Sequence, residues 1–142
     1  MKRVLMLCAC LFILAGCGGT GGTGGIGGDV ELPFTVDLRA GASTRINSDL
    51  TIRFVGVTNE SRCPTGAQCA WAGNAEVELA LSGSGDQVTH LNTGAQYPRT
   101  EKYHGYTITL QELKPYPVAG QTISPGSYTA VLVIAQEAPA SP

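Results

Sequence analysis

Apolar and polar residues alternate along much of the chain with the two-residue period that is typical of half-buried β-strands. The clearest example is Glu76–Leu81, in which the valine and leucine side chains should face a core while both glutamates face solvent. The run Tyr128–Ile134 is apolar on both faces, which predicts a central strand. Further strands are expected at Leu32–Leu38, Ile52–Val57, Gln87–Asn92 and Tyr106–Leu110.

Turn residues separate these segments. Ser82–Asp86 contains two glycines and predicts a hairpin loop, and Pro125 followed by Gly126 predicts a type II turn. No stretch shows the 3.6-residue period of an amphipathic helix. The pattern therefore predicts one all-β domain over residues 29–136, a small antiparallel β-sandwich of immunoglobulin-like kind with six to seven strands. A small β-barrel is the alternative, and residues 137–142 are expected to form a frayed tail.

The N-terminal residues have the pattern of a targeting segment. A positively charged start precedes the apolar run Val4–Ala15, which is too short to cross a hydrocarbon core that needs about 20 helical residues. The run leads into Leu14-Ala15-Gly16-Cys17, which resembles the lipobox of bacterial lipoproteins. The resemblance implies that residues 1–16 are a cleaved signal peptide. It also implies that Cys17 receives a diacylglyceryl group, whose two chains suffice for stable membrane anchoring.

A glycine-rich segment follows the predicted lipidation site. Gly18–Gly28 has almost no side chains to bury and predicts a flexible tether between the lipid and the β-domain. The expected location is therefore the cell envelope, with the lipid on Cys17 as the membrane contact. Lipoproteins kept at the inner membrane often have Asp after the cysteine, whereas this chain has Gly18. The outer membrane is favoured if the host has two membranes.

The charge of the mature chain excludes one class of partner. Removal of Lys2 and Arg3 with the signal would change the formal net charge from −2 to about −4. Nucleic-acid binding requires a clustered basic surface, so a nucleic-acid partner is not expected.

Two cysteines remain in the predicted β-domain after Cys17 is acylated. Cys63 and Cys69 would reside in an oxidising compartment, which favours a disulfide between them. Two ligands do not make a zinc site, and redox motifs usually have two intervening residues rather than five. A bridge that closes so short a loop contributes roughly 2–3 kcal/mol of stability in the chain-entropy model.

The cysteines belong to a distinctive segment that also contains the only tryptophan. Residues 62–73 read Arg-Cys-Pro, four residues, then Cys-Ala-Trp-Ala-Gly. The segment resembles a motif of exported bacterial proteins of unknown function, which implies a shared fold element more than an activity. One interpretation is a structural staple that closes an end of the sandwich. The other is a rigid recognition loop that presents Arg62, Gln68 and Trp71 to a partner.

A second segment, Gln96–Tyr106, is rich in aromatic and cationic residues and reads as a loop. One interpretation is a ligand surface for a sugar or a peptide. The other is loose packing over an edge of the sandwich. Its candidate binding residues are Tyr97, Arg99, Tyr103 and His104.

The sequence leaves several functions open. We find no G-x-S-x-G nucleophile, no H-E-x-x-H motif and no phosphate-binding glycine loop, so an enzyme such as a small hydrolase is the least supported class. No cofactor and no metal site are predicted. The leading hypothesis is a non-catalytic domain that binds an envelope protein or a wall polymer. A structural lipoprotein and a proteinase inhibitor are the alternatives.

Overall fold

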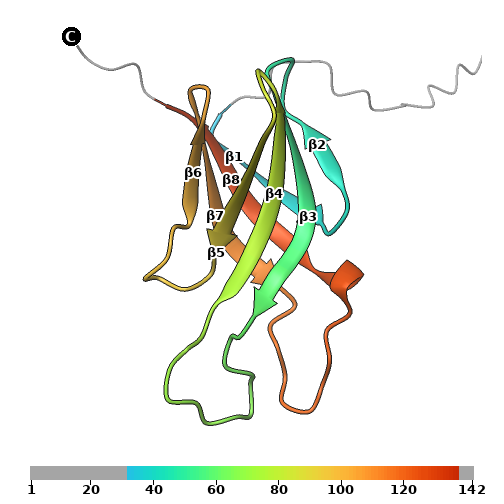
Figure 1. Ribbon diagram of the computed structural model, residues 1–142, viewed down its shortest axis with the longest axis vertical. Helices are drawn as coiled ribbons and strands as arrows, with labels where there is room; N and C mark the ends of the chain where they lie inside the picture. The colour runs from blue at the N-terminus through green and yellow to red at the C-terminus, as the bar shows by residue number, and fades with distance from the viewer. Residues whose placement is uncertain (1–31, 138–142) are drawn as a thin grey trace, which may run out of the picture.

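The computed structural model describes residues 32–137, which form two four-stranded sheets (Figure 1). The predicted signal peptide, the lipidation site Cys17, the glycine tether and the C-terminal tail lie outside the described residues. One sheet has the order β1-β8-β7-β6 and the other the order β2-β3-β4-β5. The bounds are β1 Phe34–Arg39, β2 Ser43–Arg45, β3 Leu50–Glu60, β4 Ala75–Gly83, β5 Gln87–Asn92, β6 Thr100–Tyr103, β7 Tyr106–Lys114 and β8 Thr129–Gln136, with one 3₁₀ turn, η1, at Pro125–Ser127.

The prediction of an all-β sandwich is confirmed. All strand pairs are antiparallel, and buried side chains from both sheets form one hydrophobic cluster between them. The alternative of a closed barrel is wrong, because the β1–β2 and β5–β6 connections pass between separate sheets instead of forming hydrogen-bonded pairs. Two antiparallel sheets therefore face each other as expected for a sandwich, and the strands within each sheet follow one another as a meander apart from β1 beside β8.

The predicted alternation determines which side chains enter the core. In β4, Ala75, Val77, Leu79 and Leu81 are fully buried, and the two intervening glutamates are only partly covered. β8 is mostly buried and lies between β1 and β7, as its apolar sequence predicts. Burying one face of each strand provides the main driving force for this fold.

The prediction that Gln96–Tyr106 is a loop is wrong for part of the segment. The segment contains β6, which pairs with β7 across a two-residue turn at His104 and Gly105. Both turn residues have positive φ, +43° and +85°, as a type I′ hairpin requires. Together with the short edge strand β2, β6 raises the strand count to eight.

The predicted turn at Pro125 and Gly126 is present, but the prediction of type II is wrong. Ser127 donates its amide hydrogen to the Ser124 carbonyl at 2.9 Å, which closes a turn at the expected place. Gly126, however, does not adopt the positive φ of a type II turn, and Pro125–Ser127 form a 3₁₀ turn. Proline at the first central position is compatible with both geometries, so the dipeptide does not decide between them.

The two ends of the sandwich differ. Phe34 lies opposite Ile134, and Tyr106 opposite Gln136, so the described chain starts and finishes at one end. The connections β3–β4 and β7–η1 project from the other end (Figure 1). No helix within residues 32–137 is long and apolar enough to span a membrane.

Candidate functional site

A disulfide closes the loop of residues 61–74, which joins β3 to β4. The predicted bond between Cys63 and Cys69 is present, with an S–S distance of 2.16 Å and a Cα–Cα distance of 5.9 Å. The base of the loop continues the β3–β4 pairing, because Ser61 donates to the Asn74 carbonyl at 2.7 Å and Cys63 donates to the Ala72 carbonyl at 2.8 Å. The disulfide loop is therefore held both covalently and by backbone hydrogen bonds.

Gly73 makes the base of the disulfide loop possible. It has a φ of +73°, and a Cβ placed there would lie 1.8 Å from the Ser61 carbonyl oxygen. Only glycine combines this backbone conformation with so close an approach of another backbone segment.

The loop of residues 115–124, between β7 and η1, lies beside the disulfide loop at the same end of the sandwich (Figure 1). Thr65 donates to the Pro117 carbonyl at 2.9 Å, and Ala119 donates to the Thr65 carbonyl at 3.0 Å. These bonds form a short parallel bridge between Thr65 and Val118. The two loops therefore support each other through main-chain contacts.

Arg62 anchors the disulfide loop to the strands beneath it. Its Nη1 donates to the Leu113 carbonyl at 2.8 Å and its Nη2 to the Pro115 carbonyl at 3.0 Å. Its Nε donates to Glu60 at 2.9 Å, its Nη2 forms an ion pair with the same carboxylate, and the Tyr116 ring lies 5.0 Å from its Cζ. Arg62 is only 6% exposed, which corrects the expectation that the loop presents this side chain to a partner.

Two ionisable groups close to Arg62 have shifted pKa values. Burial by itself raises the pKa of Glu60, but the hydrogen bonds and the charge of Arg62, with the Tyr128 hydroxyl, outweigh it and hold the pKa below its ordinary value. Tyr128 donates its hydroxyl hydrogen to Glu60 at 3.2 Å. Burial first, and then the negative charge of Glu60, raise the pKa of Tyr128. Glu60 is thus an ionised, structurally engaged carboxylate.

Asn74 connects the disulfide loop to a third loop, residues 93–98, between β5 and β6. Its Oδ1 accepts the amide hydrogen of Gly94 at 2.9 Å, and its Nδ2 donates to Asn92 at 2.7 Å. Tyr97, on this third loop, is 47% exposed. All three loops at this end are therefore linked by specific hydrogen bonds.

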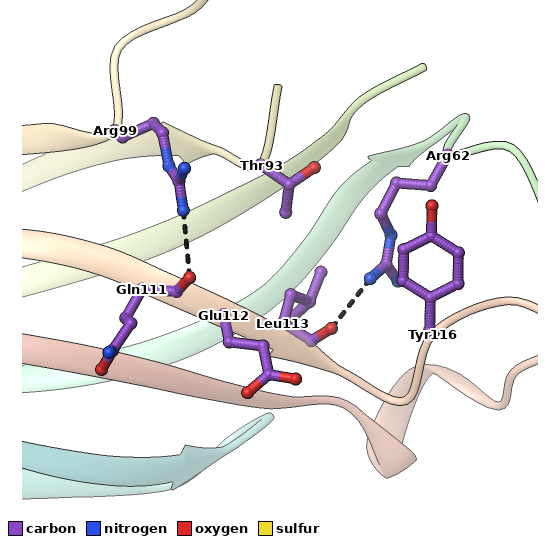
Figure 2. A pocket seen from close by; sticks show the side chains of 7 residues that line it. All are labelled: Arg62, Thr93, Arg99, Gln111, Glu112, Leu113 and Tyr116. Atoms are coloured by element: carbon purple, nitrogen blue, oxygen red, sulfur yellow. Dashed lines mark hydrogen bonds between the residues drawn. The ribbon is translucent and has the colours of Figure 1, made fainter. Parts of the chain in front are cut away.

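A small hollow of about 150 Å³ opens beside these loops, with Arg62 and Arg99 on opposite sides (Figure 2). Nη2 of Arg99 donates to the carbonyls of Leu110 and Gln111, both at 3.0 Å, while its buried Nε has no partner. Sites for small organic ligands usually measure about 300–1,000 Å³, so the hollow is too small for one. Its lining residues are Arg62, Thr93, Arg99, Gln111, Glu112, Leu113 and Tyr116.

Trp71 is the most exposed of the large apolar side chains that the structure describes, at 81%. Gln68, on the same loop, is also exposed. The disulfide loop, residues 93–98 and residues 115–124 contain only one charged residue, the buried and ion-paired Arg62. We call this set of loops the loop end. The loop end therefore presents exposed aromatic side chains, of which Trp71 is the most exposed, among hydroxyl, amide and backbone groups, with no free charge on the three loops themselves.

The candidate residues of Gln96–Tyr106 do not form one surface. Tyr103 is 2% exposed and belongs to the core, so it cannot face a ligand. His104 stacks edge-on against it, with ring centroids 4.6 Å apart, at the end of the sandwich where the chain starts. Tyr97 lies on residues 93–98 at the loop end, and Arg99 directly follows this loop and lines the hollow. The hairpin separates residues that a loop would have held together.

Several structurally important residues were missed in the sequence. Glu60, Asn74 and Tyr116 organise the loop end but belong to no recognisable motif. Arg62 and its acceptor Leu113 are separated by 51 positions, so no local spacing reveals their contact. Asn74 carries the one available signal, a short polar residue beside the glycine that ends the distinctive motif.

No family model, no curated protein and no solved structure matches this chain. Within the described residues, no group of three or more His, Cys, Asp or Glu side chains is placed to hold a metal ion.

Proposed function

We propose that this protein is a bacterial envelope lipoprotein, acylated on Cys17, that displays a non-catalytic binding domain to a protein or wall-polymer partner. The observation that carries this proposal is the difference between the two ends of the sandwich. The described chain begins at one end, whereas the loops of residues 61–74 and 115–124 project from the opposite end (Figure 1). Residues 93–98 are hydrogen-bonded to the first of these loops. A membrane anchor on the tether would therefore attach at the end of the domain opposite the loop end and leave the loop end unobstructed.

The predicted tether gives the domain a defined reach. Gly18–Gly28 as a flexible coil has a root-mean-square span of about 18 Å and a stretched length of about 35–40 Å. The domain would therefore stay near the membrane but reorient freely, which suits capture of a partner in the envelope. The rigid loop end supports the binding role, because a pre-organised surface loses little entropy when it binds.

Fractionation of host cells tests the anchor. We expect the unsubstituted protein in the membrane fraction, released only by detergent, and Cys17→Ser in the soluble fraction. Cys10→Ser is the matched control, since it removes a cysteine of the predicted signal and should leave the protein membrane-bound. Retention of Cys17→Ser in the membrane fraction would contradict the proposal.

Sedimentation with isolated host envelopes tests the binding role. The full chain with Cys17→Ser has no lipid of its own under the proposal, so saturable co-sedimentation would report a partner of the β-domain. Absence of saturable binding to any envelope preparation would refute the binding role and favour a purely structural lipoprotein.

A further inference from the structure

We infer that the partner of the loop end is a neutral polysaccharide, and that Trp71 is the stacking platform for one of its sugar rings. The inference rests on the proposed binding role and adds the chemical class of the ligand. The first supporting observation is the exposed position of Trp71. Tryptophan is highly buried on average, yet the only tryptophan of this chain is 81% exposed on a loop. The sandwich core is completed without it.

Trp71 stands on a rigid support. The disulfide, the Thr65–Val118 bridge and the buried Arg62 hold the disulfide loop, and the Cys63–Ala72 hydrogen bond fixes the residue next to Trp71. Such pre-organisation favours binding of a weakly interacting ligand, because the loop loses little conformational entropy when the ligand binds.

The charge of the loop end favours an uncharged ligand. The single charged residue of the three loops is ion-paired with Glu60. Arg99 borders the loops, but its Nη2 donates to the carbonyls of Leu110 and Gln111. The loops themselves therefore offer no free cation to an anionic polymer. A pyranose ring presents a flat face of C–H groups bordered by hydroxyl groups. The flat indole of Trp71 matches the C–H face, and Thr65 and Gln68 on the same loop have exposed hydroxyl and amide groups that can bond sugar hydroxyls.

A protein partner fits the loop end less well. Stable protein interfaces bury about 800 Å² on each partner and have an apolar centre. The exposed apolar side chains here are distributed over three loops, namely Trp71, Tyr97, Tyr116 and Val118.

The single tryptophan makes intrinsic fluorescence a direct probe of this site. The full chain with Cys17→Ser is titrated with soluble oligomers of glucose, N-acetylglucosamine, mannose and xylose. We expect at least one series to shift the Trp71 emission to shorter wavelength saturably, because stacking removes the ring from water. The midpoint should be the same at about 0.1 M and about 1 M NaCl, since no ion pair is formed.

Substitutions then assign the binding to Trp71. Trp71→Ala should reduce retention on the corresponding insoluble polysaccharide by at least about tenfold, and Trp71→Phe by less. Val88→Ala is the matched control, because Val88 is 61% exposed on β5, outside the loop end. It should be retained like the unsubstituted chain. Circular dichroism verifies folding, and the fluorescence titration needs no substitution in the loop.

The inference would be overturned if no oligosaccharide changes the Trp71 emission, or if Trp71→Ala is retained like the unsubstituted chain. It would also be overturned if only an anionic polymer binds and salt abolishes that binding. If envelope sedimentation is saturable but disappears when envelope proteins are digested, the partner is a protein. The proposed binding role would then stand and the polysaccharide inference would fail.

Discussion

Replacement of Arg62 by alanine is the most informative perturbation of the fold. The substitution removes the ion pair with Glu60 and the donors to the carbonyls of Leu113 and Pro115. It also removes the cation beneath the Tyr116 ring. The disulfide loop would remain attached to β3 and β4 but would lose its connection to the end of β7.

The expected loss in the free energy of unfolding is large because the groups that Arg62 binds remain without their partner. The Arg62 side chain is 4% exposed and that of Glu60 is 23% exposed. Removing one member of a buried ion pair typically costs about 3–5 kcal/mol, since the other charge is left without compensation. Domains of this size have a free energy of unfolding of about 5–15 kcal/mol. The melting temperature should fall by about 12 °C or more, at about 4 °C for each kcal/mol.

Urea unfolding of the full chain with Cys17→Ser, under oxidising conditions, measures this cost. Far-ultraviolet circular dichroism is the appropriate signal, because Trp71 is already exposed in the folded state and its emission should change little. Arg62→Lys should recover only a small part of the loss, since one ammonium group cannot replace the forked guanidinium. Arg53→Ala is the control at an exposed arginine and should change stability by less than about 0.5 kcal/mol.

A loss below about 1 kcal/mol for Arg62→Ala would refute the reasoning. The disulfide and backbone bonds would then be sufficient to position the loop.

Two further predictions concern the same end of the molecule. The pKa of Glu60 is lowered from its ordinary value of 4.5, so its ion pair stabilises the fold fully above that pH and progressively less as pH falls through the folded-state pKa. Glu60→Gln should therefore flatten the decline of the unfolding free energy below pH 4.5, and equal slopes for the two proteins would contradict this assignment. Gly73→Ala should cost about 3 kcal/mol or more in urea unfolding, because its Cβ meets the Ser61 carbonyl. Gly120→Ala, where φ is also positive but nothing lies within 4 Å, should cost only about 1–2 kcal/mol, and equal losses would show that the close contact at Gly73 is unimportant.

The predictability of the strands depended on their length and on their position in the sheets. β4 and β8 are long and bury a regular set of apolar side chains, so their period is visible locally. β2 has three residues and lies at a sheet edge, and β6 has four residues of which only Tyr103 is buried. Such strands are stabilised by pairing with a neighbour and leave little hydrophobic pattern of their own. His104-Gly105 was the available sign of the β6–β7 hairpin, because histidine tolerates positive φ better than most residues.

In the disulfide loop, too, the sequence predicted some features and the fold decided others. Cys63 and Cys69 were paired correctly because few cysteines remain in the domain and they lie close together along the chain. Arg62 and Trp71 looked equivalent in the motif, yet the fold buries the first and exposes the second. The difference arises from backbone carbonyls that β7 and the following loop bring beneath Arg62.

The sequence by itself determined the all-β class, the inward faces of the main strands and the disulfide, because each depends on periodicity or on proximity along the chain. Tertiary structure decided which end of the sandwich carries the linked loops, which polar side chains are internal and which aromatic ring faces solvent. Those outcomes depend on contacts between residues far apart in the chain, such as Tyr128 and Glu60, which are 68 positions apart. Only the packing of one sheet on the other brings such residues together.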